Sequence, residues 1–173
     1  SSEDDEIIDI AAQYGAATHR RDLSIADDRS TVAEVCLDVI GTKFNEIFCC
    51  IYPTAVLLSS DTISYSKALF DDYGELKASV LMGVSKYNYH PAQALSFGED
   101  NSGALLFPEF RGMQSQFYPR ARVSNGTFYW GRKISFESEK SFYSEKLKLY
   151  DVPDLEVCDI DTPEDYDRLL SRG

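Results

Sequence analysis

Two aspartates are the residues of this chain best suited to chemistry. Asp159 and Asp161 lie one residue apart in VCDIDTPEDYDRLL, residues 157–170, at the end of an apolar run. If residues 155–160 form a strand, alternate side chains share a face, so both carboxylates point the same way. Two oxygen ligands in this arrangement suit a hard cation such as Mg²⁺, which keeps several waters.

The residues that follow this pair predict the start of a helix. Thr162 is a good N-cap, Pro163 suits the first helical position, and Asp165 completes a T-x-x-D capping box. The two aspartates would then stand at the carboxyl end of a strand, where ligands bind in open α/β sheets. The alternative is that Asp161 and Asp165 only favour the helix N-terminus, and these residues alone leave both interpretations open.

Three further stretches have polar groups at places where a ligand could bind. IYPTAVLLSSDTI (51–63) is a strand end, a turn and a capped helix start, although an ordinary connection has the same features. RDLSIADDRST (21–31) is a polar loop ahead of a helix whose free N–H groups could receive a ligand. SQFYPRARVSNGTFYWG (115–131) combines amides, hydroxyls, an Asn-Gly turn and aromatics, which suit a sugar pocket or a hairpin at a subunit contact.

Composition narrows the class of protein. The 173 residues carry 17 Lys and Arg against 29 Asp and Glu, a net charge of −12, which argues against a nucleic-acid surface. No apolar stretch approaches the roughly 20 residues of a membrane span, and no signal peptide is visible. With only two histidines, a histidine metal site or a Ser-His-Asp triad is disfavoured. We expect a cytoplasmic protein whose four cysteines are reduced core thiols.

The hydrophobic pattern predicts alternating helices and strands. An α/β sheet in a three-layer sandwich, with an inserted β excursion, fits this order best. The continuous apolar run at 46–52 predicts a strand buried on both faces, as in a parallel sheet. The expected helices are 2–14, with Ile7, Ile10, Ala11 and Tyr14 on one face, then one after Thr31, 60–73 and about 134–145; the expected strands are 46–52, 78–85, a hairpin within 93–107, 128–131, 146–150 and 155–160.

Several motifs in order resemble one family over almost the whole chain. They are RDLSIADD (21–28), YPTAVLL (52–58), HPAQAL (90–95), SQFYP (115–119), NGTFYWG (125–131) and CDIDTPED (158–165). Together they resemble the cytidylyltransferases that activate nine-carbon acidic sugars, the CMP-nonulosonic acid synthetases or acylneuraminate cytidylyltransferases, and most closely their pseudaminic acid branch. Asp22, Val56 and Ala94 depart from the family pattern.

The resemblance implies a fold and a reaction. It implies a Rossmann-like nucleotidyltransferase domain over residues 1–173, in which 86–130 is an inserted segment for sugar binding and dimerisation. CTP and a free nonulosonic acid, with pseudaminic acid favoured, would give the CMP-sugar and pyrophosphate for cell-surface glycan biosynthesis. The anomeric hydroxyl of the sugar attacks the α-phosphorus, and Mg²⁺ offsets phosphate charge.

The same resemblance assigns residues. It implies that Asp159 and Asp161 are catalytic metal ligands. It places two further groups of residues at the substrates: Arg21, Asp28 and Ser30 at the nucleotide, and Gln93, Ser115, Gln116, Asn125 and Tyr129 around the sugar.

One part of the family pattern has no counterpart here. The family begins with a strand and a Gly-rich basic loop that cradles the triphosphate, and this chain starts after that loop, so we expect an N-terminally incomplete domain. The alternative function is therefore a truncated, non-catalytic homologue that acts as a binding or dimerisation module. A phosphatase with an aspartate dyad is disfavoured, because its D-x-D pair ordinarily opens the domain.

Overall fold

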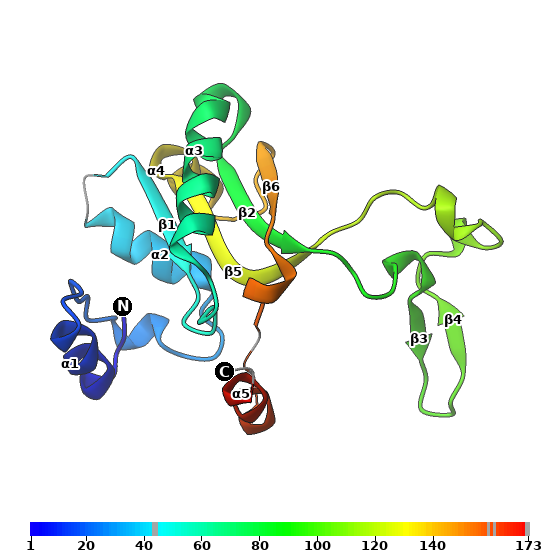
Figure 1. The fold of residues 1–173 in the computed structure, drawn as a ribbon, viewed down its shortest axis with the longest axis horizontal. Coiled ribbons are helices and arrows are strands. Elements are labelled where there is room, and N and C mark those ends of the chain that lie inside the picture. Colours follow the sequence, from blue (N-terminus) through cyan, green and yellow to red (C-terminus); the bar gives the residue numbers. More distant parts are fainter. Residues whose placement is uncertain (43–44, 159, 161, 172–173) are drawn as a thin grey trace.

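A computed structural model describes residues 1–42, 45–158, 160 and 162–171, without the side chain of Arg168. A four-stranded mixed sheet lies at the centre of the described chain. The strand order is β1-β5-β2-β6 (Figure 1). β2 pairs in parallel with β6, whereas β5 pairs antiparallel with both β1 and β2. The strands are β1 (Ile47–Ile51), β2 (Val80–Ser85), β5 (Val123–Arg132) and β6 (Leu147–Asp151).

Helices cover both faces of this sheet. Alternate residues of β2 and β5 point to opposite sides, so the chain has two apolar clusters. On one face Met82 and Tyr129 pack with Ile40 of α2 (Val32–Gly41) and Phe136 of α4 (Lys133–Glu139). On the other face Leu81, Phe128 and Trp130 pack with Phe70 of α3 (Ser60–Lys77). Two further helices, α1 (Asp5–Gln13) and α5 (Pro163–Leu170), flank this body.

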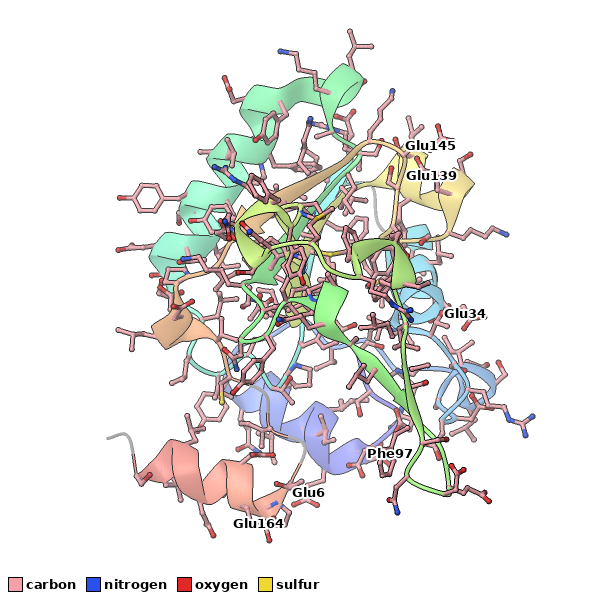
Figure 2. The ribbon with its side chains drawn as sticks, turned by 90° about the vertical axis from the view of Figure 1, so that its right-hand side faces the viewer. Glu6, Glu34, Phe97, Glu139, Glu145 and Glu164 are labelled. Atoms are coloured by element: carbon pink, nitrogen blue, oxygen red, sulfur yellow. The ribbon has the colours of Figure 1, made fainter. Side chains whose placement is uncertain are left out.

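A long arm leaves the body between β2 and β5 (Figure 1). It carries the two-stranded hairpin β3 (Leu95–Phe97) and β4 (Gly103–Leu105), followed by two short 3₁₀ turns. Its large apolar side chains are unusually exposed: Tyr89 is 85% exposed, Phe97 82% and Phe117 69%. Figure 2 shows Phe97 in this hairpin, while labelled glutamates lie on α1, α2, α4, α5 and the loop after α4.

Much of the predicted order of elements is confirmed. The structure is α/β, Thr31 and Glu34 form the capping box of α2, and the hairpin turns at residues 98–102. All four cysteines lie in the described residues and are free thiols. Among the described residues, no helix is both long and apolar enough to cross a membrane. The nucleotidyltransferase character of the fold and the role of the arm in dimerisation stay predictions.

Several predicted elements are wrong in detail. Residues 155–158 and 160 form no strand; the chain makes a 3₁₀ turn at Asp154–Glu156 instead, because Pro153 ends the pairing that β6 begins. β1 lies at the sheet edge and is half-buried rather than buried on both faces. The helix expected at 134–145 ends at Glu139, where Lys140 adopts a left-handed conformation with φ 52°.

The expected apolar face of the first helix is also not in the core. None of the residues of α1, all of which are described, is buried, and Ile7 and Ile10 are 57% and 48% exposed. Asp4, rather than Ser2, caps this helix by accepting from the Ile7 N–H at 3.1 Å. Helical spacing predicted the helix itself, but it carries no information on which element covers the apolar side.

Candidate functional site

The carboxyl ends of the three parallel strands lie at one edge of the sheet. β1 leads there into the 52–59 loop, β2 into the arm, and β6 into the 3₁₀ turn at Asp154–Glu156 (Figure 1). Because β5 runs the opposite way, its first residues come to the same edge, where Ser124 pairs with Val84. Ligands of open α/β sheets bind at such an edge, so this is the candidate site.

Glu156 joins two of these connections. Its carboxylate accepts from the backbone N–H and the hydroxyl of Ser59, both at 3.0 Å, and Ser59 is the N-cap of α3. Desolvation acts to raise the pKa of Glu156, but hydrogen bonds from the Ser59 N–H and from the Thr62 and Ser59 hydroxyls lower it overall. A carboxylate at this helix N-terminus also interacts favourably with the helix dipole. The segment before CDIDTPED is thereby fixed against the YPTAVLL loop.

Asn125 is a predicted sugar residue that the structure places at this edge. Its side-chain nitrogen donates to the Ser85 hydroxyl at 3.0 Å, and its oxygen accepts from the Thr127 N–H and hydroxyl at 3.2 and 2.7 Å. The expected Asn-Gly turn is instead a bulge inside β5, where the pairing to β2 shifts between Met82 and Val84. Gly126, with φ 63°, supplies the left-handed residue of this bulge.

Tyr129, a second predicted sugar residue, is a core side chain. It is 6% exposed and its hydroxyl is 2.6 Å from that of Ser124. Its ring lies 5.6 Å from that of Tyr52, the first residue after β1, and burial is the main cause of the raised pKa of Tyr52. Tyr129 therefore packs in the core beneath this edge, in contact with Ser124 and Tyr52.

The other predicted sugar residues are separated from these two. Gln93, Ser115 and Gln116 all lie on the arm, in 3₁₀ turns at Pro91–Gln93 and Ser115–Phe117. His90 stabilises the base of the first turn, because its ring accepts from the Ala92 N–H at 3.1 Å and lies 2.8 Å from the Pro119 oxygen. In the described single chain, Asn125 and Tyr129 are on β5, whereas the other three predicted sugar residues are on the arm.

The predicted nucleotide segment precedes α2. Arg21 is an ion-pair partner of Glu3 at 3.4 Å and donates to the Ser1 carbonyl at 2.9 Å. The Ser30 hydroxyl donates to Asp27 at 2.8 Å, and this bond, with two backbone N–H groups, lowers the pKa of Asp27. Asp28 is exposed in the same loop. Hydrogen bonds within the segment therefore hold its shape, while Arg21 is engaged with the N-terminal residues.

The predicted metal ligands Asp159 and Asp161 lie outside the described residues. The helix start after them is as expected: Thr162 and Asp165 form a capping box, with the Asp165 carboxylate 3.1 Å from the Thr162 nitrogen. The described residues contain no cluster of three or more His, Cys, Asp or Glu able to hold a metal. The metal role of the two aspartates stays a prediction.

The sequence analysis missed one charged group at this edge. Arg122 forms a two-bond ion pair with Asp151, the last residue of β6, and its hydrogen bond lowers the pKa of Asp151. Beside the pair, a cavity of about 260 Å³ is lined by Lys86, Asp151 and the next three residues. The signal in the sequence was the position of Asp151 at the carboxyl end of KLKLYD, the same argument that singled out Asp159.

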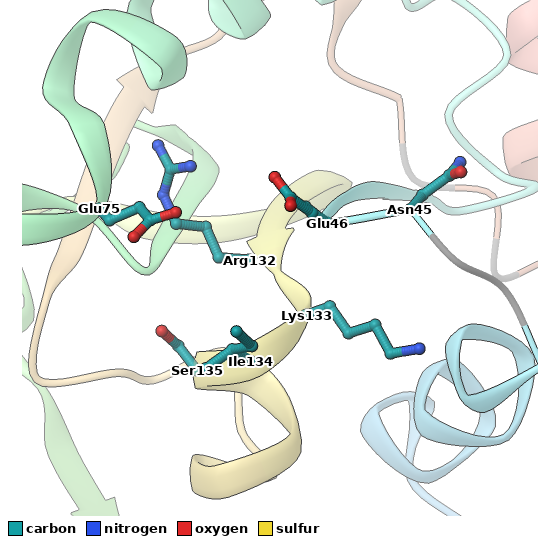
Figure 3. A pocket seen from close by; sticks show the side chains of 7 residues that line it. All are labelled: Asn45, Glu46, Glu75, Arg132, Lys133, Ile134 and Ser135. Atoms are coloured by element: carbon teal, nitrogen blue, oxygen red, sulfur yellow. The ribbon is translucent and has the colours of Figure 1, made fainter.

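A second cavity, of about 160 Å³, lies at the opposite end of the strands (Figure 3). Figure 3 shows Glu75 next to Arg132. The Arg132 guanidinium stacks on Phe70 and donates to the carbonyls of Ala78 and Phe70 at 2.9 and 3.2 Å. These bonds tie the C-terminal part of α3 to the end of β5. This cavity is separate from the candidate site.

The fold defines an α/β protein with polar side chains at the carboxyl ends of its strands. No family model matches the chain. Two curated relatives, both named pseudaminic acid cytidylyltransferase, come from Campylobacter jejuni subsp. jejuni serotypes O:2 and O:23/36. Each is 28% identical over 174 residues, which cover 96% of this chain and 73% of the relative. The resemblance to the CMP-nonulosonic acid synthetases is thereby confirmed.

Proposed function

We propose that this chain transfers CMP from CTP to a nonulosonic acid, with pseudaminic acid favoured, and releases pyrophosphate. The observation that carries the proposal is the similarity over 96% of the chain to two proteins named for that activity. The polar edge supports it, because the 52–59 loop and the turn at Asp154–Glu156 are joined there by Ser59 and Glu156.

The proposal gives separate tasks to the residues of this edge. Asn125 is held by Ser85 and Thr127, so its amide has a fixed direction for contact with a polar sugar. Lys86 lines the cavity beside Asp151 and would attract the carboxylate of an acidic sugar. Arg122 offsets the charge of Asp151, which would otherwise repel an anionic substrate.

Asp159 and Asp161 are the proposed Mg²⁺ ligands. Their two carboxylates are hard oxygen donors one residue apart, the chemistry that Mg²⁺ prefers. Asp165 accepts hydrogen bonds from the Thr162 N–H and hydroxyl in the helix cap. The cap therefore uses the Asp165 carboxylate and not the carboxylates of the two proposed metal ligands. When bound, Mg²⁺ would offset negative charge on the phosphates of CTP.

Pyrophosphate release tests this function. The chain is incubated with Mg²⁺, CTP and, in turn, pseudaminic, legionaminic and sialic acid; we expect release with pseudaminic acid above the other two. Asp161→Asn should lower the rate by about 100-fold or more, because it removes a charged metal ligand. Glu164→Gln, an exposed change in the first turn of α5, should retain the rate. No release with any sugar, or equal rates for the two variants, would contradict the proposal.

We also propose that the chain forms a homodimer through the arm. The exposed aromatic residues of the arm support this, since an apolar surface of this kind marks an interaction site. The same feature favours the alternative function, a non-catalytic dimerisation module. Dimer formation without pyrophosphate release would favour that alternative.

A further inference from the structure

The side-chain amide of Asn125 is fixed in one orientation. The Thr127 backbone N–H is 3.2 Å from this amide, and because a backbone N–H can only donate, the atom that faces it is the oxygen Oδ1. The Thr127 hydroxyl lies 2.7 Å from the same oxygen and therefore donates as well. On the other side of the amide, the nitrogen Nδ2 donates to the Ser85 hydroxyl at 3.0 Å. These three hydrogen bonds exclude the flipped orientation of the amide.

The hydrogen-bonding capacity of Asn125 is used unevenly. Its oxygen has two lone pairs, and the N–H and the hydroxyl of Thr127 occupy both. Its nitrogen has two hydrogens, of which Ser85 accepts one, and no other group among the described residues accepts the second. The side chain is only partly buried, at the edge of the candidate site. Asn125 can therefore act toward a ligand as a hydrogen-bond donor but not as an acceptor.

Thr127 maintains this orientation from within the sheet. Its side chain is fully buried, so water does not replace its hydroxyl. Tyr52 donates its backbone N–H to the Thr127 carbonyl at 3.1 Å from the β1 side. On the β2 side Gly83 makes room for the hydroxyl, because a Cβ atom at residue 83 would lie 2.6 Å from Thr127 Oγ1. Both neighbouring strands thus hold Thr127 in place against the Asn125 oxygen.

We infer that Thr127 is a positioning residue of the candidate site: it presents Asn125 as a hydrogen-bond donor and so selects an acceptor oxygen on the sugar. The inference rests on the proposed function, which supplies the sugar. A nonulosonic acid has two kinds of acceptor, its carboxylate and neutral oxygens such as an acyl carbonyl. A ligand with a donor group in that place is disfavoured, because two donors cannot pair.

Calorimetric titration of the chain with pseudaminic acid tests the role of Thr127. Thr127→Val removes the hydroxyl and keeps the branched shape, so it should raise the sugar dissociation constant about 3- to 10-fold, the usual effect of one lost hydrogen bond. Thr127→Ser keeps the hydroxyl and should stay within about twofold of the parent. Circular dichroism verifies that each variant is folded.

Thr42→Val is the matched control for this series. It also removes a threonine hydroxyl, which donates to the Val39 carbonyl at 2.8 Å. Thr42 lies at the end of α2, before the start of β1, and not at the carboxyl ends of the strands. The dissociation constant of this variant should equal that of the parent chain.

The methyl ester of pseudaminic acid tests the polarity of the contact. Asn125→Asp replaces the donor nitrogen by an acceptor oxygen, and should weaken binding of the ester about 10-fold although the ester has no charge to be repelled. Asn125→Ala distinguishes the two acceptors without adding charge. A larger loss for the acid than for the ester assigns the contact to the carboxylate, because hydrogen bonds to charged groups are stronger. Equal losses assign it to a neutral oxygen.

NMR spectra of the isotope-labelled chain report on the Asn125 amide itself. Its side-chain N–H signals are identified by their loss in Asn125→Asp. In the free chain, Thr127→Val should shift these signals and Thr127→Ser should leave them near their parent positions. Pseudaminic acid should shift them in the parent chain.

Two kinds of failure can be told apart. Three results would overturn the inference and leave the proposed function standing: sugar binding that leaves the Asn125 signals unmoved, equal losses of affinity for Thr127→Ser and Thr127→Val, or an ester that binds Asn125→Asp as tightly as the parent. No binding of the acid or the ester to the parent chain would overturn both.

Discussion

At the scale of single residues, a buried hydrogen bond joins α3 to the central sheet. The Trp130 Nε1–H donates to the Ser66 hydroxyl at 2.9 Å, and that hydroxyl donates to the Ile63 carbonyl at 3.0 Å. Ser66 is fully buried and Trp130 is 8% exposed, so water does not replace a lost partner. This contact fixes the indole on α3 and, with it, the sheet face that carries Leu81 and Phe128.

Ser66→Ala should destabilise the fold by about 1–3 kcal/mol, because the Trp130 N–H is then buried without an acceptor. Urea denaturation measures the free energy of unfolding. Ser64→Ala is the matched control: the same substitution in the same helix, at an exposed residue, should stay within about 0.5 kcal/mol of the parent. Equal effects of the two substitutions would show that the indole hydrogen bond contributes nothing measurable.

This contact shows what residue patterns leave undetermined. Helical spacing predicts the helix that contains Ser66, and the aromatic run predicts the strand that contains Trp130. The two residues are 64 positions apart, and the packing of α3 on β5 decides their meeting.

At the scale of elements, Glu156 connects the turn after β6 to the start of α3. Its folded-state pKa is lowered, so the contribution of its charge to stability is present above the ordinary glutamate value of 4.5 and is lost as the pH falls through the lowered value. Glu156→Gln should therefore destabilise the fold by about 1 kcal/mol at pH 7, a typical contribution of a helix cap.

The pH dependence of the unfolding free energy tests whether the effect of Glu156→Gln comes from the lost charge of the carboxylate. The difference in unfolding free energy between the parent chain and Glu156→Gln should shrink below pH 4.5 and vanish once Glu156 is protonated in the folded state. Glu145→Gln, at an exposed glutamate (Figure 2), should show little difference at either pH. A difference for Glu156→Gln that stays constant with pH would exclude a role for the charge.

The elements themselves were predicted with uneven success. Strong local patterns gave the correct helix start after Thr31 and the correct hairpin within residues 93–107. The apolar residues Leu155 and Val157 suggested a strand, but Pro153 interrupts the pairing of β6, and a 3₁₀ turn follows. The apolar run of β1 looked buried on both faces, and nothing local indicates that the strand lies at an edge.

At the scale of the whole molecule, the topology decides which motifs meet. The sequence placed several polar stretches at strand ends, and the parallel arrangement of β1, β2 and β6 brings those ends to one edge, as expected. The same topology separates Asn125, on β5, from Gln93 and Ser115, on the arm. A motif order shared with a family cannot reveal this separation, because it records position along the chain and not distance in space.

At this scale, the proposed dimerisation through the arm can be tested by substitution. Phe97→Asp should shift the protein from dimer to monomer in light scattering and raise the dissociation constant by about 10-fold or more, since it would bury a charge in an apolar contact. Phe97 is 82% exposed in the single chain, so the fold of the monomer should tolerate the change. Tyr65→Asp, at a 70% exposed aromatic residue of α3, is the matched control and should remain dimeric. A monomeric parent chain, or equal dissociation constants for the parent and Phe97→Asp, would contradict dimerisation through the arm.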